Sequence, residues 1–160
     1  MPTATTPKAI KTQKTQLYFA IAAQATKLGA ITNFNGLGGQ KPEIDTTNLD
    51  SEAKEFLTGL EDSGTFSVNV NIDPKDTSQE QVFALKDSGE VVAWALCLSD
   101  GAAAPTANAG DLAAPDDRSC FIFAATVQQF TVSGEADNIV KGQITLRITG
   151  KIARHWKAAP

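Results

Sequence analysis

The sequence is poor in the side chains on which most catalytic and metal sites depend. Among its 160 residues there is one histidine, His155, and there are two cysteines, Cys97 and Cys120, each inside an apolar run. A cysteine or histidine metal site needs several ligands, and a serine or cysteine nucleophile needs a positioned base. We therefore expect no metal, no cofactor and no disulfide framework, and we expect the two thiols to behave as small hydrophobic groups.

Long hydrophobic runs and an excess of positive charge are also absent. No segment approaches the roughly 18 consecutive apolar residues of a membrane span, and the N-terminal residues lack the apolar core of a secretory signal. The formal net charge is −4, whereas a general nucleic-acid binder needs a basic surface. The glycines of residues 36–39 lack the spacing of a phosphate-binding loop. These absences predict a protein that is made in the cytosol and has no membrane partner.

The charges that are present are divided unevenly along the chain. Residues 1–40 carry four lysines and no acid, residues 141–160 carry five bases and no acid, and all 18 acids lie between Glu43 and Asp137. The basic ends can pair with the acidic middle of a neighbouring copy, or with acidic loops of their own domain. Charge alone leaves both arrangements open.

Hydrophobic periodicity predicts a mainly β fold. Residues 65–72 alternate strictly between apolar and polar side chains, which is typical of a strand with one buried face. Residues 90–98 are apolar on both faces, as in a strand buried on both sides, and Trp94 within them is expected in the core. Residues 119–134 and 139–152 form a predicted hairpin with a bulge near Gln128. Shorter strands are expected over 17–21 and 28–34, joined by a short helix or a loop.

One helix interrupts the strands. Residues 77–88 begin with an N-cap signal at Thr77 or Ser78 and stop at Gly89. The fold class that follows is an antiparallel β-sandwich or barrel with one short flanking helix.

Four segments lack a sustained period. Residues 1–16 are expected to form an extended arm, and residues 154–160 a basic aromatic tail beyond the domain at 17–153. Residues 99–117 are expected to be an exposed flexible loop. Residues 40–64 hold seven acids and form a predicted long loop with a helical turn over 51–60, and a loop of this length indicates a functional or partner-bound segment.

The order of these features resembles the major tail tube proteins of long-tailed, non-contractile, lambda-like bacteriophages. The resemblance rests on residues 30–37 (AITNFNGL), 41–50 (KPEIDTTNLD) and 59–68 (GLEDSGTFSV) and on the final hairpin, with 132–137, 142–146 (GQITL) and 148–150 (ITG). It covers residues 17–153, and none of its motifs is catalytic.

The resemblance implies a structural virion protein that forms six-membered rings stacked into a tube for genome ejection. The implied partners are further copies of the chain, the tail tip or initiator, the tape measure and the terminator, and DNA passes through without specific binding. The long loop and the terminal arms are implied to contact neighbouring subunits, with assembly in the host cytoplasm. The candidate interface residues are Lys8, Lys11, Lys14, Glu43, Asp45, Leu49, Phe56, Leu57, Leu60 and Trp156. The chain ends soon after the last strand, so no appended immunoglobulin-like domain is expected.

The polar face of the 65–72 strand is the candidate lining of the tube. Its side chains are small and uncharged, so they would not hold phosphate groups. They are Thr65, Ser67, Asn69 and Asn71. The same face can also simply contact bulk water.

Two other functions are open from the sequence. A monomeric carbohydrate-binding β-sandwich predicts aromatic side chains clustered on one exposed face. A small hydrolase would use loop carboxylates such as Glu43, Asp45, Glu52 and Glu55, although exposed carboxylates are usually only solvated.

Overall fold

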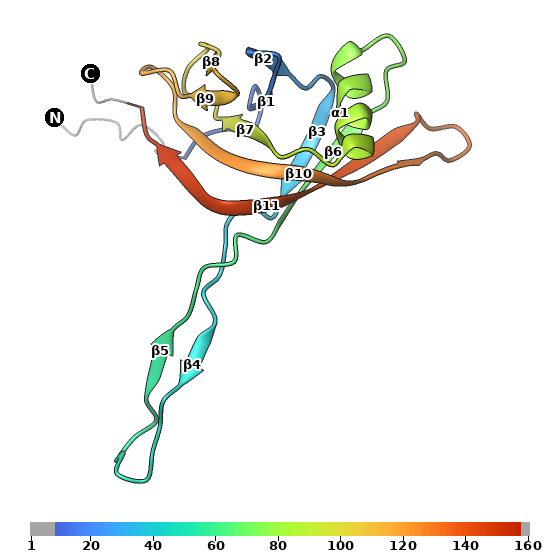
Figure 1. The fold of residues 1–160 in the computed structure, drawn as a ribbon. Coiled ribbons are helices and arrows are strands. Elements are labelled where there is room, and N and C mark those ends of the chain that lie inside the picture. The colour runs from blue at the N-terminus through green and yellow to red at the C-terminus, as the bar shows by residue number, and fades with distance from the viewer. Residues whose placement is uncertain (1–8, 158–160) are drawn as a thin grey trace, which may run out of the picture.

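The computed structural model describes residues 9–157, which form one antiparallel seven-stranded sheet, two small hairpins and one helix (Figure 1). The sheet order is β2-β1-β7-β10-β11-β6-β3. Its strands are β1 (Gln16–Ile21), β2 (Gln24–Lys27), β3 (Ile31–Asn35), β6 (Thr65–Asn71), β7 (Val92–Cys97), β10 (Cys120–Ser133) and β11 (Lys141–His155). The hairpins are β4 (Glu43–Asp45) with β5 (Phe56–Thr58), and β8 (Thr106–Asn108) with β9 (Asp111–Ala113).

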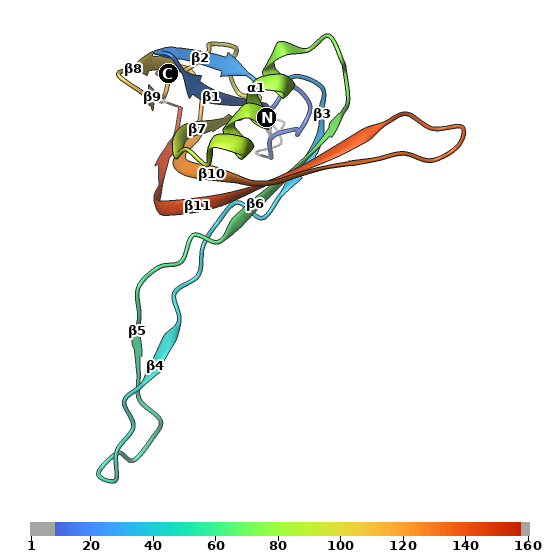
Figure 2. The ribbon, with the colours of Figure 1, turned by 45° about the vertical axis from the view of Figure 1, so that its right-hand side comes forward.

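The prediction of a mainly β, antiparallel fold with one helix is confirmed. The sheet curls around its core, so that side chains of β1 meet those of β6 and β11 in one cluster. The edge strands β2 and β3 are not paired with each other, so the sheet is not closed into a barrel. The long β10–β11 hairpin crosses the whole molecule and extends beyond it at one end (Figure 2).

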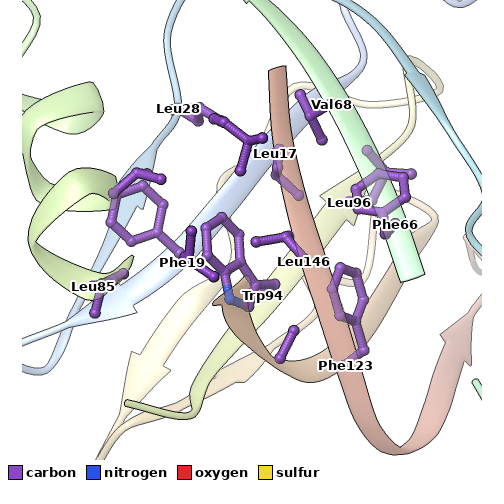
Figure 3. Packing of buried hydrophobic residues seen from close by; sticks show 14 of the residues in the cluster. Leu17, Phe19, Leu28, Phe66, Val68, Leu85, Trp94, Leu96, Phe123 and Leu146 are labelled. Carbon is purple, nitrogen blue, oxygen red and sulfur yellow. The ribbon is translucent and has the colours of Figure 1, made fainter. Parts of the chain in front are cut away.

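Aromatic and aliphatic side chains fill the concave side of the sheet (Figure 3). Trp94 is fully buried, as predicted, and lies 5.1 Å from the Phe19 ring, centroid to centroid. Phe66 meets Phe123 edge to face at 5.7 Å. The predicted alternation of β6 holds because Phe66, Val68 and Val70 are all fully buried. The predicted bulge is also confirmed by a register shift between Val127 and Gln129.

The helix α1 (Thr77–Ser88) covers one end of this core (Figure 1). Its Phe83 stacks on Phe130 of β10 at 3.9 Å, and its Val82 is fully buried. The bounds agree with the prediction, but the N-cap is Asp76, whose carboxylate accepts the Ser78 amide at 2.9 Å. A carboxylate caps as well as a hydroxyl, so the cap lies one residue earlier than the Ser/Thr signal indicated.

Three predictions about irregular segments are wrong. Residues 22–27 are neither a helix nor a loop, because Ala22 and Ala23 make a two-residue turn with φ values of 50° and 64° and β2 follows at once. The strand expected over 28–34 begins only at Ile31. No helical turn forms over 51–60, where β5 lies instead. Residues 99–117 are not simply an exposed loop, since they contain β8 and β9 and bury Leu112.

The hairpin β8–β9 covers the convex side of the sheet near the ends of β7 and β10. Its Leu112 belongs to a second buried cluster, with small side chains from β1 and β7 and with Cys120. The C-terminal tail predicted at 154–160 begins two residues later, because Arg154 and His155 belong to β11 and pair with β10. Among residues 9–157, no helix is long and apolar enough to cross a membrane.

Candidate assembly surfaces

The β4–β5 hairpin projects away from the rest of the molecule (Figures 1 and 2). Three residue pairs hold it together, from Glu43 opposite Thr58 to Asp45 opposite Phe56. At its base, Gln40 and Asp62 form an isolated bridge with reciprocal backbone hydrogen bonds of 2.9 Å. The sequence predicted a long loop of functional importance here, and the structure shows a two-stranded projection.

The projecting hairpin carries apolar side chains that the described chain does not bury. Leu49 at its tip is fully exposed, and Leu60 is 91% exposed. Phe56, Leu57 and Ile44 are each half-exposed or more. An isolated two-stranded hairpin is only marginally stable in water. Ile44 was not among the predicted interface residues, although it lies in the same motif as Glu43 and Asp45.

Side-chain hydrogen bonds shape the tip of the hairpin. The Asp45 carboxylate accepts the Thr47 amide at 2.9 Å, and the Thr47 hydroxyl oxygen accepts the Glu55 amide at 2.8 Å. The Ser51 hydroxyl donates to the Glu55 carboxylate at 3.1 Å. The hydrogen bonds from Thr47 hold the pKa of Asp45 below its ordinary value. A general acid needs a raised pKa, so Asp45 is in the wrong protonation state for that role near neutral pH.

The base of the hairpin is tied to β11. The Ser63 hydroxyl donates to the Gly150 carbonyl at 2.6 Å. The Asp62 carboxylate accepts the Gly64 amide at 3.0 Å and pairs with the Arg147 guanidinium at 3.1 Å. The Gly64 hydrogen bond, followed by Arg147, lowers the pKa of Asp62. These contacts fix the direction in which the hairpin leaves the sheet.

A cavity of about 600 Å³ lies beside the base of the hairpin, at the open end of the core. Its apolar lining comes from both halves of the sheet, and its charged lining is mostly basic. The apolar residues are Phe34, Leu37, Leu96, Leu98, Phe121 and Ile152, and the charged ones are Lys41, Lys151, Arg154 and Glu61. Nothing in the sequence pattern identified this cavity, because its walls come from segments that are far apart in the chain.

The two ends of the described chain meet near a buried arginine. Arg118 is 1% exposed and was not singled out by the sequence. Its guanidinium makes five hydrogen bonds, and all five acceptors are neutral oxygens. They are the carbonyls of Leu98 (2.7 Å), Ala103 (2.9 Å), Lys14 (3.3 Å) and Cys97 (3.3 Å) and the side-chain oxygen of Gln16 (3.0 Å).

The candidate arm and tail residues lie around this arginine. The Lys11 carbonyl accepts the Ser99 hydroxyl at 2.6 Å, and the side chains of Lys11 and Lys14 are exposed. Trp156 packs edge to face on Phe121 at 5.7 Å but is still 60% exposed. Lys8 lies outside the described residues. The arm and the tail therefore leave the body close together, on one side of the sheet.

The polar face of β6 continues across its neighbours. Ser67 lies opposite Thr145 of β11, and Asn69 lies opposite Gln143. On the other side, the Asn69 side chain donates to that of Asn33, and the Thr32 hydroxyl donates to the Asn69 carbonyl at 3.1 Å. The candidate residues Thr65, Ser67, Asn69 and Asn71 thus form part of a wider polar belt over β3, β6 and β11. In β11, the alternation of polar and apolar side chains over residues 143–151 predicted which residues face the same side as this belt.

Comparison with known proteins identifies the family. A family model described as the lambda-like phage tail tube protein matches residues 8–158. The chain belongs to this family. It is a structural component of a phage tail. The chain is also 30% identical over 149 residues to Structural protein 3 of Pseudomonas phage PAJU2, covering 89% of this chain and 91% of that protein.

Solved structures share the fold of this tail tube protein at low sequence identity. The tail of an empty gene transfer agent particle, refined with C6 symmetry, matches with a TM-score of 0.68 and 12% identity, covering 91% of this chain and 98% of that chain. The SPP1 tail tube matches with a TM-score of 0.68 and 13% identity, covering 94% of this chain and 81% of that chain. The sheath/tube terminator of an extracellular contractile injection system, PVC, matches with a TM-score of 0.69 and 14% identity, covering 94% of this chain and 99% of that chain.

Proposed function

We propose that this tail tube protein assembles with itself into six-membered rings, which stack into the conduit for genome ejection. The observation that carries the proposal is the β4–β5 hairpin, whose exposed apolar side chains have no cover within the described chain. The C6 symmetry of the gene transfer agent tail, which has the same fold, supports the ring number. Tube assembly would give the hairpin the partner surface that an isolated hairpin needs.

The hairpin tip and the cavity carry mostly opposite charges, and both expose apolar side chains. Leu49 lies at the tip beside the acidic residues Asp50 and Glu52, whereas the cavity is lined by apolar side chains and by bases that include Lys151 and Arg154. We assign the tip of one copy to the cavity of a neighbour. Burying Leu49 would supply about 2 kcal/mol, and the charges would fix the orientation.

The terminal residues supply a second contact. Lys11, Lys14 and Trp156 are exposed side chains close to the point where the arm and the tail leave the body. Lys8, outside the described residues, precedes them in the sequence and is assigned with them. We assign these residues to the contact between one ring and the next, because both ends of the chain can then reach the same neighbour.

The polar belt on β6 is assigned to the lumen. The small uncharged side chains of β6 would keep the wall wet without binding phosphate groups, so that DNA passes them without being held. Two bases of β11, Lys141 and Arg147, lie opposite Asn71 and Thr65 at the two ends of the belt. The further partners that this assignment implies are the tail tip or initiator, the tape measure and the terminator proteins. Assembly would take place in the host cytoplasm.

A carbohydrate-binding module is less well supported by the aromatic side chains. Such a module stacks sugars on exposed rings, but Tyr18 and Trp94 are buried and Trp156 lies on Phe121. A hydrolase that uses the loop carboxylates would pair a protonated carboxyl with an ionised one, and the lowered pKa of Asp45 fits only the ionised role. We therefore propose a purely structural, non-enzymatic role.

Electron microscopy of the concentrated purified protein tests the proposal. The wild type should form hollow tubes or rings of uniform diameter. Leu49→Asp should leave a folded monomer that forms neither, whereas the matched control Val91→Asp should assemble, because Val91 is 57% exposed but lies in neither surface. Tubes of Leu49→Asp as abundant as those of the wild type would contradict the role of the hairpin.

Charge reversal tests the pairing of tip and cavity separately. Asp50→Lys with Glu52→Lys should prevent assembly, as should Lys151→Glu with Arg154→Glu. An equimolar mixture of the two double variants should recover heterotypic contacts, and the quadruple variant should form tubes again. If the quadruple variant stays monomeric while the wild type forms tubes, the hairpin contacts a different surface and the tube function is unaffected.

A further inference from the structure

The only two cysteines of the chain lie side by side in neighbouring strands. Cys97 ends β7 and Cys120 begins β10, and the two residues are direct partners in the register of the antiparallel pair. Their sulfur atoms are 2.8 Å apart, and both side chains are buried. The sequence predicted two unrelated hydrophobic thiols, and that prediction did not foresee their contact.

The hydrogen-bond pattern places this pair at a position where a disulfide fits. The Leu98 amide donates to the Ser119 carbonyl at 2.9 Å, one step beyond the cysteines. Cys97 and Cys120 are therefore a non-hydrogen-bonded pair, in which Cα atoms are about 4.5 Å apart. Disulfides span Cα distances of roughly 4.4–6.8 Å. A bond between the two sulfurs needs no movement of either strand.

The surroundings favour reaction of one thiol. The guanidinium of Arg118 donates to the Cys97 carbonyl at 3.3 Å and has no carboxylate partner within residues 9–157. Hydrogen bonding between the thiols lowers the pKa of Cys120, which burial opposes and the charge of Arg118 reinforces. The same contact, with burial, raises the pKa of Cys97. A thiolate beside a neutral thiol is the arrangement that precedes disulfide formation.

The cover over the pair is thin. Both cysteines lie at strand ends, and the β8–β9 hairpin that packs on them through Leu112 has strands of only three residues each. Short hairpins with few buried contacts open locally at low free-energy cost, and such opening would let small oxidants reach the sulfurs without global unfolding.

We propose that Cys97 and Cys120 are a redox pair that closes into a cross-strand disulfide when the protein meets a peroxide outside the reducing cytosol. The Cys120 thiolate attacks one peroxide oxygen, the O–O bond breaks, and a sulfenic acid and water form after proton uptake. The Cys97 sulfur then attacks the sulfenic sulfur and a second water leaves. The two thiols lose two protons and two electrons, which one peroxide takes up as it becomes two waters.

The disulfide would close a ring containing residues 98–119, including β8, β9 and Arg118. It would fix the part of the molecule to which the N-terminal arm is hydrogen-bonded. A virion released from its host leaves the reducing compartment, so the bond would form after assembly and lock the subunit. This inference does not depend on the number of subunits in a ring or on the docking of the hairpin.

Mass spectrometry of the full chain tests the proposal. The reduced protein is treated with one equivalent of hydrogen peroxide, denatured in the presence of an alkylating reagent, and digested with trypsin. The expected result is a protein that takes up no alkyl group and has lost two hydrogens. Peptides 87–118 and 119–141 should be joined by a bond that dithiothreitol cleaves. The oxidised protein should also melt about 5–10 °C above the reduced one.

Single variants supply the control. Cys97→Ala and Cys120→Ala should each give no linked peptides and no oxidative rise in melting temperature under the same treatment. The proposal is overturned if the wild type keeps two alkylatable thiols. It is equally overturned if its cysteines gain oxygen atoms without linkage, or if the linked peptides come from dimers on a non-reducing gel.

Discussion

Replacing the buried Arg118 with methionine should destabilise the protein strongly. The guanidinium donates to four backbone carbonyls and to Gln16, from a position that is 1% exposed. Methionine fills much of the same volume but has no hydrogen-bond donor. The carbonyls of Cys97 and Leu98 therefore lose a charged donor at a buried site. Each acceptor left without its donor costs about 1–3 kcal/mol of folding free energy. Removal of the buried charge offsets part of this cost, because the charge no longer has to be desolvated on folding. The expected net loss is about 3–5 kcal/mol.

Urea denaturation followed by circular dichroism measures this loss, because the midpoint shifts while the slope stays constant. The urea midpoint of Arg118→Lys should lie between those of the wild type and Arg118→Met, since an ammonium keeps the charge but cannot reach as many acceptors. The matched control is Arg147→Met, where the arginine forms an exposed ion pair with Asp62, and its midpoint should equal that of the wild type. Equal midpoints for Arg118→Met and Arg147→Met would refute the reasoning.

Three other changes follow from local structure. Replacing Ala22 with Asn and Ala23 with Gly should raise the free energy of unfolding by about 1 kcal/mol, measured by urea denaturation, because the turn requires positive φ at both positions. Asp76→Ala removes the N-cap of α1 and should cost about 1 kcal/mol in the same assay. Hydrogen bonds lower the pKa of Asp62, and those from Ser119 lower that of Asp100 despite partial burial. Both groups therefore stabilise the fold above their unfolded pKa, near 3.9, and that stability is lost as the pH falls through the lower folded values. The urea midpoint should be constant from about pH 7 to 5 and fall below about pH 4, less steeply in Asp62→Asn.

The parts of the fold that were predictable are those in which one face is buried. In β6 and in the β10–β11 hairpin the core imposes a period of two, and the sequence displays it directly. The bulge at Val127 and Gln129 was visible for the same reason, since the apolar parity changes there. The helix was visible through its cap and stop signals, although the capping residue itself was misassigned.

The parts that were not predictable lack such a one-sided environment. The β4–β5 hairpin is exposed on both faces, so nothing imposes an alternation on residues 43–58. The Ala22–Ala23 turn lacks the Asn-Gly signal that usually marks two-residue hairpins. The β8–β9 hairpin contributes a single buried leucine, Leu112, which is too little for a periodic pattern.

Contacts between distant segments were invisible for a different reason. The role of Arg118 depends on carbonyl groups, which every residue has, so no side-chain pattern could predict its five hydrogen bonds. The meeting of Cys97 and Cys120 depends on the register of two strands separated by the β8–β9 segment. The candidate interface residues Leu49, Phe56 and Leu60 are exposed, and their contact with other copies stays a prediction.

The fold also bears on the two arrangements of charge that the sequence left open. Within residues 9–157 the ion pair is that between Arg147 and Asp62, at the base of the hairpin. The acidic tip around Asp50 and Glu52 lies away from the body (Figure 1), so it cannot neutralise the bases beside the cavity of its own chain. Opposite charges that cannot meet within one molecule attract another molecule instead, and they do so in one orientation. The pair of Arg147 with Asp62 shows that a base of the C-terminal segment meets an acid of the middle within one domain. The acids of the hairpin tip have no such base beside them, and for them we propose the contact with another copy.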